Sequence, residues 1–179
     1  MLVEKQGVDE CMLATIAALA GRTLDETRRI ACKAARVRKW HSLFNHGNRH
    51  DLYRAGVLAV CREYDPSGRL LRLVGRKPSG WSYSAVSMPA DENGVKVVMR
   101  GSMELPLGYH GSITIGRPGV SHICPWRDGK VYDPNHPETP TSLNAILSHY
   151  CFSLMFLTMT PNGVNVEDEV NPDQPDLGY

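Results

Sequence analysis

Hydrophobic positions in the first third of the chain recur at the spacing of helices. The first such run is apolar on more than one face, which predicts a helix buried nearly all round, with Asp9 as its N-cap and Gly21 as its stop. Thr23 and Glu26 then form a capping box, so a second helix is expected to about Val37, with its basic face outward. Two helices therefore lead the chain.

The next segment is less regular. Residues 38–50 show no clean period and are interpreted as a loop over the surface. A third helix is expected with Asp51 as its cap, ending before the turn signal at 65–68. Residues 57–61 would also serve as a short buried strand, and Gly56 weakens a helix interior, so both interpretations remain open here.

From about residue 70 onward the pattern changes to that of strands. Runs of strand or mixed character, separated by turn signals, lie at 70–74, 80–88, 95–100, 112–116 and 151–160. Ser142 is placed to cap a brief helix before the last of these runs. Helices first and strands afterwards indicate one α+β domain over residues 1–160. The acidic, proline-rich tail at 161–179 is expected to be poorly ordered.

One hairpin can be assigned a register. Asp128-Gly129 is a preferred centre for a two-residue turn, so residue numbers of paired positions around it sum to a constant. Cys124 then lies opposite Asp133, and His122 lies opposite Asn135. Side chains alternate between faces along a strand, so these four point to the same side of the hairpin. The imidazole and the carboxylate become diagonal neighbours about 7 Å apart by backbone, within side-chain reach.

Composition narrows the class of protein. A chain of 179 residues with 42% hydrophobic content is long enough for one domain with a core. It shows no apolar run of about eighteen residues and no signal-peptide pattern at 1–5, so we expect a cytoplasmic protein without a membrane span. The five cysteines are odd in number, widely spaced and without a CxxC pair, which favours reduced thiols over disulfides or a structural zinc site.

The charge and the histidines of the sequence indicate neither nucleic acid nor metal as a ligand. The net charge is +1, and the arginines of the second helix are interpreted as its solvated side, so nucleic acid is not the expected partner. His41, His46 and His50 lie on a segment with no regular element to fix their spacing, so no metal is expected there. No cofactor is expected, and the sequence leaves the oligomeric state open.

Candidate chemistry comes from residues far apart in the sequence. Cys11 falls in the first turn of the predicted helix, where unpaired N–H groups and the helix dipole favour a thiolate. The amide of Gln6 is placed to turn back and donate to an oxyanion. His122, oriented by Asp133, would take the thiol proton, and the thiolate would attack a carbonyl. A cysteine in an apolar helix is also commonly a packing residue, so that interpretation stays open.

These residues resemble a known family. In the papain-like cysteine peptidases, most closely the branch that cleaves double-glycine leaders from bacteriocin precursors and its stand-alone relatives in bacteria and phages, a Gln precedes an Asp-Cys pair that opens an Ala-rich helix. A later His starts a strand, and a Gly-containing turn leads to Asp-Pro. The matching residues, within a resemblance that covers roughly 5–161, are Gln6, Cys11, Ala14, Gly21, His122, Asp133 and Pro134.

The resemblance implies a fold and a set of roles. The family fold packs an N-terminal helical half against an antiparallel sheet, with the site in the cleft between them. Cys11 would be the nucleophile and His122 the general base and acid. Asp133 would orient the imidazole, and Gln6 would be the oxyanion donor. The sequence differs from the family at Glu10, where Asp is usual, at Met12, where Gly is common, and in placing Gln6 one residue closer to the cysteine.

Three functions are weighed on this basis. The leading hypothesis is a cysteine hydrolase that cleaves a peptide or isopeptide bond in a peptide or protein substrate, and the same thioester chemistry would serve an amidase or deamidase. The alternative is a non-catalytic binding or regulatory protein that keeps the peptidase scaffold, such as a phage product acting on a host protein. A nucleic-acid binder using the Arg-rich second helix is the third, and the near-neutral net charge counts against it.

Overall fold

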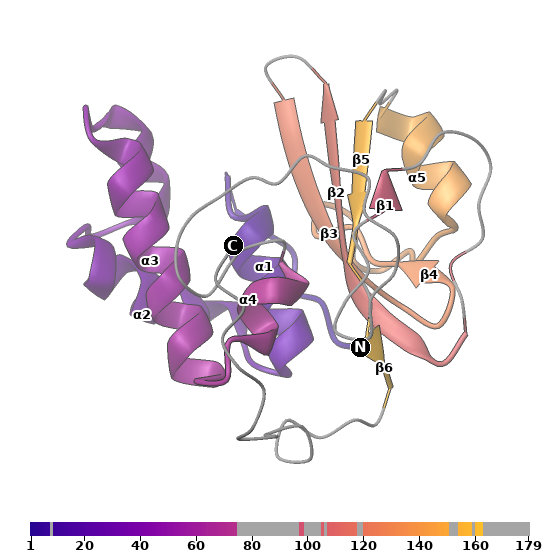
Figure 1. Ribbon diagram of the computed structural model, residues 1–179. Coiled ribbons are helices and arrows are strands. Elements are labelled where there is room, and N and C mark those ends of the chain that lie inside the picture. Colours follow the sequence, from indigo (N-terminus) through magenta and orange to yellow (C-terminus); the bar gives the residue numbers. More distant parts are fainter. Residues whose placement is uncertain are drawn as a thin grey trace.

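A computed structural model gives the fold of the chain, and it describes residues 1–7, 9–74, 97–98, 105, 107–117, 120–150, 154–158 and 160–162. Helices α1 (Cys11–Ala20), α2 (Leu24–Ala35), α3 (Arg49–Tyr64) and α4 (Arg69–Leu73) gather on one side of an antiparallel sheet, as Figure 1 shows. Helix α5 (Leu143–Tyr150) lies on the opposite side of the sheet (Figure 1). The expected α+β class, with helices leading the chain, is confirmed.

The first two helices are close to their expected positions, with shifted ends. The N-cap of α1 is Glu10 rather than Asp9, because Asp9 adopts a left-handed conformation at φ 58°. Cys11 is therefore the first residue of α1, not the second. Gly21 ends α1 at φ 64°, as expected of a C-cap glycine. The Thr23 side chain accepts a hydrogen bond from the Glu26 backbone N–H, which confirms that half of the capping box.

The segment expected to be a surface loop is partly helical and partly buried. Residues Trp40–Asn45 form a 3₁₀ helix, η1, and Trp40 is only 1% exposed. Helix α3 begins at Arg49, and its N-cap, Asn48, lies three residues before the expected cap, Asp51. Helix α3 also includes residues 57–61, which excludes the strand considered for them. A Cβ at Gly56 would lie 2.5 Å from the Trp40 ring, so the glycine allows this close approach.

The expectation of a strand at 70–74 is wrong. Residues 69–73 form the short helix α4. The second helix, α2, is also shorter than expected: it ends at Ala35 because Arg36 adopts φ 55°. The Asp65 carboxylate accepts hydrogen bonds from the Leu70 backbone N–H and the Ser67 hydroxyl, which fixes the chain at the start of α4. Periodicity cannot distinguish a short apolar strand from one buried helical turn, and here a side chain outside the run decides.

The sheet contains strands β1 (Val97–Val98), β2 (Tyr109–Arg117), β3 (Val120–Arg127), β4 (Lys130–Val131), β5 (Leu154–Leu157) and β6 (Thr160–Pro161). Their order is β1-β5-β2-β3-β4, and β6 pairs with β2. The strands expected at 95–100, 112–116 and 151–160 correspond to β1, β2 and β5, and Ser142 caps α5 by accepting from the Ala145 N–H. The run at 80–88 and residues 163–179 of the expected tail lie outside the described residues.

Helix α1 packs beside β3, and this contact joins helices α1–α4 to the sheet. Strand β4 pairs with Trp126 and Arg127 at the end of β3, and its Val131 also pairs with Thr141. Further along β3, the Thr15 hydroxyl donates to the Ile123 carbonyl at 3.1 Å, and Ile123 joins the apolar core of α1–α4. A second core, which includes Ile113 and Ile146, lies between the sheet and α5. No helix among the described residues is long and apolar enough to cross a membrane.

Candidate active site

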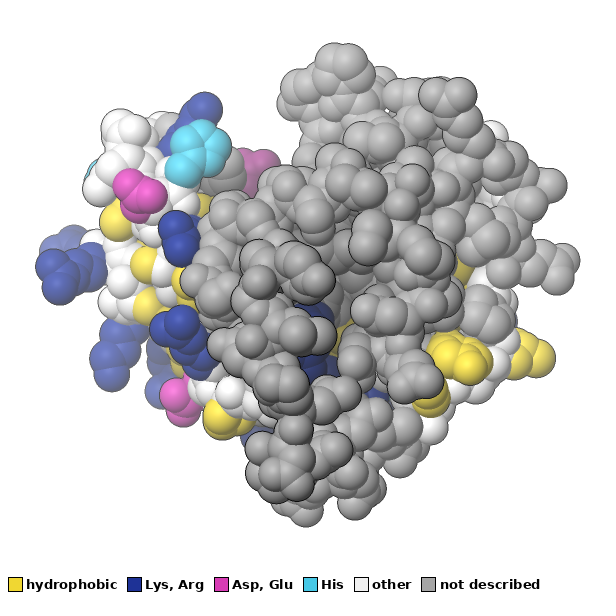
Figure 2. Space-filling model, viewed as in Figure 1, with side chains coloured by type: hydrophobic (Ala, Val, Ile, Leu, Met, Phe, Trp, Pro, Cys, Tyr) yellow, Lys and Arg dark blue, Asp and Glu magenta, His cyan; other side chains and the backbone are white. Residues whose placement is uncertain are grey.

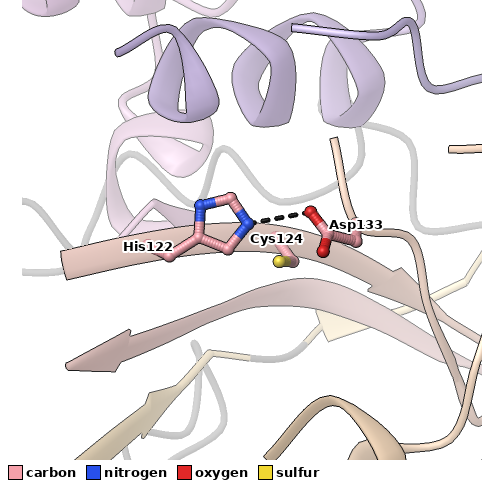
Figure 3. A group of neighbouring side chains, drawn as sticks. All are labelled: His122, Cys124 and Asp133. Carbon is pink, nitrogen blue, oxygen red and sulfur yellow. Dashed lines mark hydrogen bonds and ion pairs between the residues drawn. The ribbon is translucent and has the colours of Figure 1, made fainter. Parts of the chain in front are cut away.

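The hairpin between β3 and β4 places a histidine beside an aspartate. Asp128 and Gly129 have φ values of 49° and 80°, which identify the two-residue turn with both central residues left-handed. The Tyr132 N–H donates to the Pro125 carbonyl at 3.0 Å, so the expected register continues beyond β4. His122 Nε2 then lies 2.9 Å from Asp133 Oδ1 (Figure 3). The predicted diagonal contact is confirmed.

This pair is buried and tightly held. His122 is 6% exposed and Asp133 is 3% exposed. The backbone N–H of Asn135 donates to the same Asp133 oxygen at 2.8 Å, so the carboxylate cannot easily rotate away from the ring. Figure 3 shows Nε2 of the imidazole turned toward Asp133 and Nδ1 directed away from it. The carboxylate thus fixes which ring nitrogen is available to a reacting group.

Two thiols flank the imidazole. Burial alone would lower the pKa of His122, but hydrogen bonds with the side chains of Asp133, Cys11 and Cys124 outweigh burial and hold it well above its usual range. Cys11 is half-buried, whereas Cys124 is fully buried. Burial raises the pKa of the Cys124 thiol to about 11, although its hydrogen bond with His122 acts in the opposite direction. The site therefore contains one partly accessible thiol and one enclosed thiol.

The segment that carries Cys11 is fixed to α2 by an ion pair. The Arg28 guanidinium donates to both oxygens of the Glu10 carboxylate, at 2.6 and 2.9 Å, and Glu10 is 5% exposed. The Gly7 backbone N–H donates to the same carboxylate at 2.8 Å. Burial alone would raise the pKa of Glu10, but the bonds from Arg28 and Gly7 lower it overall. Glu10 is thus an ionised anchor immediately before the thiol.

Sequence reasoning did not find this anchor. It assigned Arg28 to the solvated face of the second helix, and no local pattern relates an arginine in α2 to a glutamate eighteen positions earlier. Figure 2 shows Lys and Arg side chains over the helical side of the molecule, with Asp and Glu among them. Arg28 differs from a purely solvated side chain, because it is 34% exposed and paired with the buried Glu10 carboxylate.

Gln6 reaches the far side of the same site. Its backbone N–H donates to the Pro134 carbonyl at 2.9 Å, and its side-chain amide donates to Asn135 Oδ1 at 2.5 Å. These contacts place Gln6 beside the loop that carries Asp133. Gln6 Oε1 is buried without a hydrogen-bond partner in the described structure. The sequence correctly predicted that Asn135 lies on the same face of the hairpin as His122, but it contains no pattern that predicts a hydrogen bond from Gln6.

The cluster around His122 also has the composition of a metal site. The ligand atoms of His122, Cys124 and Asp133 lie within 4.8 Å of one another, and all three residues are buried. Within the described ranges, His41, His46 and His50 are not part of any such group.

Comparisons of this chain with family models, with curated proteins and with solved structures found no match. Its chemistry has to be inferred from the geometry of its own residues.

Proposed function

We propose that this protein is a cysteine hydrolase that cleaves a peptide or isopeptide bond through a Cys11 thioester. The observation that carries the proposal is the buried His122–Asp133 pair, 2.9 Å apart, with Cys11 bonded to the same imidazole from the first residue of a helix. A nucleophile, a base and an orienting carboxylate are the parts of an activated thiol. The hydrogen bond with Asp133 also favours the imidazolium form of His122.

Each group has a defined part in the reaction. Asp133 holds the Nε2 side of the ring, so the proton of the Cys11 thiol passes to Nδ1. The thiolate sulfur then bonds to the substrate carbonyl carbon. The scissile C–N bond breaks as Nδ1 returns the proton to the leaving amine, which leaves an acyl thioester on Cys11. Water activated by the same imidazole hydrolyses the thioester and regenerates the thiol.

Donors for the oxyanion are present on the Cys11 side. The first N–H groups of α1 have no partner within the helix, because the first helical bond runs from the Ala14 N–H to the Glu10 carbonyl. A Gln6 amide carries two hydrogens, so it can donate to Asn135 and to an oxyanion at once. Its bond to Asn135 directs the amide toward the loop after β4, and we propose that its second hydrogen serves the oxyanion.

The finer family assignment is part of the same proposal. The chain order of Cys11 on a helix, His122 on a strand and Asp133 after a Gly-containing turn supports a papain-like arrangement at the junction of α1 and β3. The thioester can be resolved by water after loss of an amine from a peptide bond or from a side-chain amide. Peptidase, amidase and deamidase therefore share the site, and the substrate assigns the name.

Turnover can be tested without a known substrate. The full chain is incubated with a complex peptide mixture, and mass spectrometry searches for new termini, for Gln or Asn converted to the acid, and for an acyl adduct on Cys11. We expect such products from the native protein and from Cys32→Ser, a matched control for a buried thiol in the helical core, and none from Cys11→Ser. Products that persist in Cys11→Ser contradict the proposal.

A further inference from the structure

The proposed hydrolysis does not use Cys124. Its side chain is fully buried, yet it points to the same face of β3 as His122 and is hydrogen-bonded to that imidazole. Figure 3 shows its sulfur beside the His122–Asp133 pair. A thiol, an imidazole and a carboxylate, with ligand atoms all within 4.8 Å of one another, need a common explanation.

The geometry is near that of a coordination site. A tetrahedral Zn²⁺ with bond lengths of about 2.0–2.3 Å keeps its ligand atoms roughly 3.3–3.8 Å apart. Nε2 and Oδ1 are 2.9 Å apart, and every other pair of ligand atoms lies within 4.8 Å, at most about 1 Å beyond the upper tetrahedral value. Metal binding would require side-chain rotations that close this difference and open the Nε2–Oδ1 separation by a few tenths of an ångström. Cysteine, histidine and aspartate are all zinc ligands, and three protein ligands leave a fourth position for water.

We propose that His122, Cys124 and Asp133 bind one Zn²⁺ ion, and that this ion switches off the hydrolase. The binding half of the proposal stands on the cluster itself, whereas the inhibitory half rests on the proposed function of Cys11.

Charge balance favours a divalent ion in this buried position. On binding, Cys124 releases its thiol proton to solvent and its sulfur bonds to the metal, while Asp133 binds as the carboxylate. His122 binds through Nε2 as the neutral imidazole, and any second ring proton also leaves to solvent. One thiolate and one carboxylate then cancel the 2+ charge, so the site stays neutral where a net charge would be costly.

Binding at Nε2 removes the base that Cys11 needs. The hydrogen bond between Nε2 and Asp133 Oδ1 is replaced by bonds from each atom to the metal. A neutral imidazole with its Nε2 lone pair on zinc carries its proton on Nδ1. Nδ1 then has no lone pair with which to accept a proton from Cys11. The same ring cannot serve zinc and catalysis at once.

The binding half is tested by spectroscopy on the metal-free full chain. Titration with Co²⁺ is expected to give one equivalent with a thiolate-to-cobalt charge-transfer band, displaced by Zn²⁺. Cys124→Ser should lose the band and weaken binding on the order of 100-fold or more, while Cys11→Ser and Cys32→Ser should keep both. X-ray absorption of the native zinc complex should show one sulfur ligand, a result that does not depend on any variant folding.

Several outcomes overturn the binding half. They are the absence of stoichiometric binding, a zinc shell without sulfur, and a Co²⁺ band that survives in Cys124→Ser. Binding that disappears instead when His41, His46 and His50 are replaced together by Ala would move the site to that segment.

The inhibitory half is tested by the rate at which iodoacetamide alkylates Cys11, measured with excess chelator and again with Zn²⁺. In the native protein, we expect Zn²⁺ to slow the alkylation of Cys11 at least about tenfold, and we expect chelation to restore the rate. In Cys124→Ser, Zn²⁺ should change that variant's own rate by less than about twofold. Zinc that binds without slowing alkylation overturns inhibition alone. If Cys11 is not selectively alkylated even with chelator, the proposed hydrolase fails, while the Co²⁺ titration still decides the metal site.

Discussion

The two sides of the candidate site are held in place by different kinds of interaction. His122 and Asp133 are positioned by backbone pairing around one tight turn, and their side chains are eleven positions apart. Cys11 is positioned by side chains from distant parts of the chain. Arg28 holds Glu10, and Gln6 holds the loop after β4 through a contact that spans 129 positions.

The difference shows which parts of a site follow from local sequence. A hairpin with a defined turn sets the faces of all its residues at once, so one Asp-Gly pair suffices to bring an imidazole to a carboxylate. The Cys11 side depends on ion pairs and amide contacts that no period encodes. Substitutions that weaken each side separately should therefore have distinct signatures.

The largest effect on stability is expected from Asp133→Ala. It leaves the buried His122 imidazole without the carboxylate that balances its charge, and breaking a buried pair by removing one partner costs about 3–5 kcal/mol. Urea unfolding would measure the change. The double variant His122→Ala/Asp133→Ala should recover part of the loss, and a double variant no better than the sum of the single changes would contradict a coupled pair.

Arg28→Ala should lower the stability of the protein by removing the ion pair that holds the segment before Cys11. It leaves the Glu10 carboxylate buried without its guanidinium, a loss of about 1.5–3 kcal/mol in unfolding free energy at pH 7. Arg29→Ala, an exposed neighbour in α2, is the matched control and should be within about 0.5 kcal/mol of the native protein. Equal effects from the two variants would show that the Glu10 contact contributes nothing.

The Arg28 effect should also depend on pH, with a definite sign. Folding lowers the pKa of Glu10 below its ordinary value of 4.5, so the stabilisation is present above that value and is lost as pH falls through the folded-state pKa. The difference in unfolding free energy between native protein and Arg28→Ala should be full at pH 7 and shrink below about pH 4.5. A difference that is constant from pH 7 to pH 3 would contradict the ionised anchor.

Gly129→Ala tests the hairpin side without removing any functional group. An added Cβ meets no atom closer than 3.4 Å, so the cost comes from the left-handed backbone and is expected to be about 1–2 kcal/mol. Gly47→Ala is the control, because Gly47 has ordinary φ and no atom within 4 Å of an added Cβ. Thermal unfolding of both variants measures this loss of stability. If Gly47→Ala is destabilised as well, the loss in Gly129→Ala cannot be assigned to its left-handed φ.

The smallest effect is expected from Asp25→Ala. Asp25 also contacts Arg28, at 3.2 Å, but its side chain is 90% exposed. Exposed ion pairs contribute about 0–0.5 kcal/mol in such a position, so this variant should unfold almost as the native protein does. Denaturant curves for Asp25→Ala and Arg28→Ala, compared directly, separate the exposed partner of Arg28 from the buried one.

The sequence predicted most of the architecture that local rules determine. Gly21 and Thr23 gave helix ends, and Asp128-Gly129 gave the register that joins His122 to Asp133. The misassigned strand and the misassigned surface loop have one cause in common, which is tertiary context. Residues 69–73 are helical because Asp65 caps that turn from outside it, and Trp40 is buried because Gly56 in α3 makes room for its ring.

The candidate site, like the fold, was predictable only where local sequence patterns determine it. Cys11, His122 and Asp133 were proposed from types and spacing, and Gln6 from its position upstream of the cysteine. The anchor from Arg28 and the bond from Gln6 to Asn135 were missed because each joins side chains from separate elements. The hairpin register places Cys124 on the face of His122, but no pattern in the sequence indicated metal binding there.

The most direct test of the account is the rate at which iodoacetamide modifies Cys11 at pH 7 in the presence of chelator, located by mass spectrometry. We expect Cys11 in the folded protein to react faster than the same thiol in the unfolded chain, and His122→Ala, shown by circular dichroism to be folded, to lower the rate by about 10²-fold or more. A Cys11 that reacts no faster folded than unfolded, at a rate unchanged in His122→Ala, would show a thiol that the imidazole does not activate.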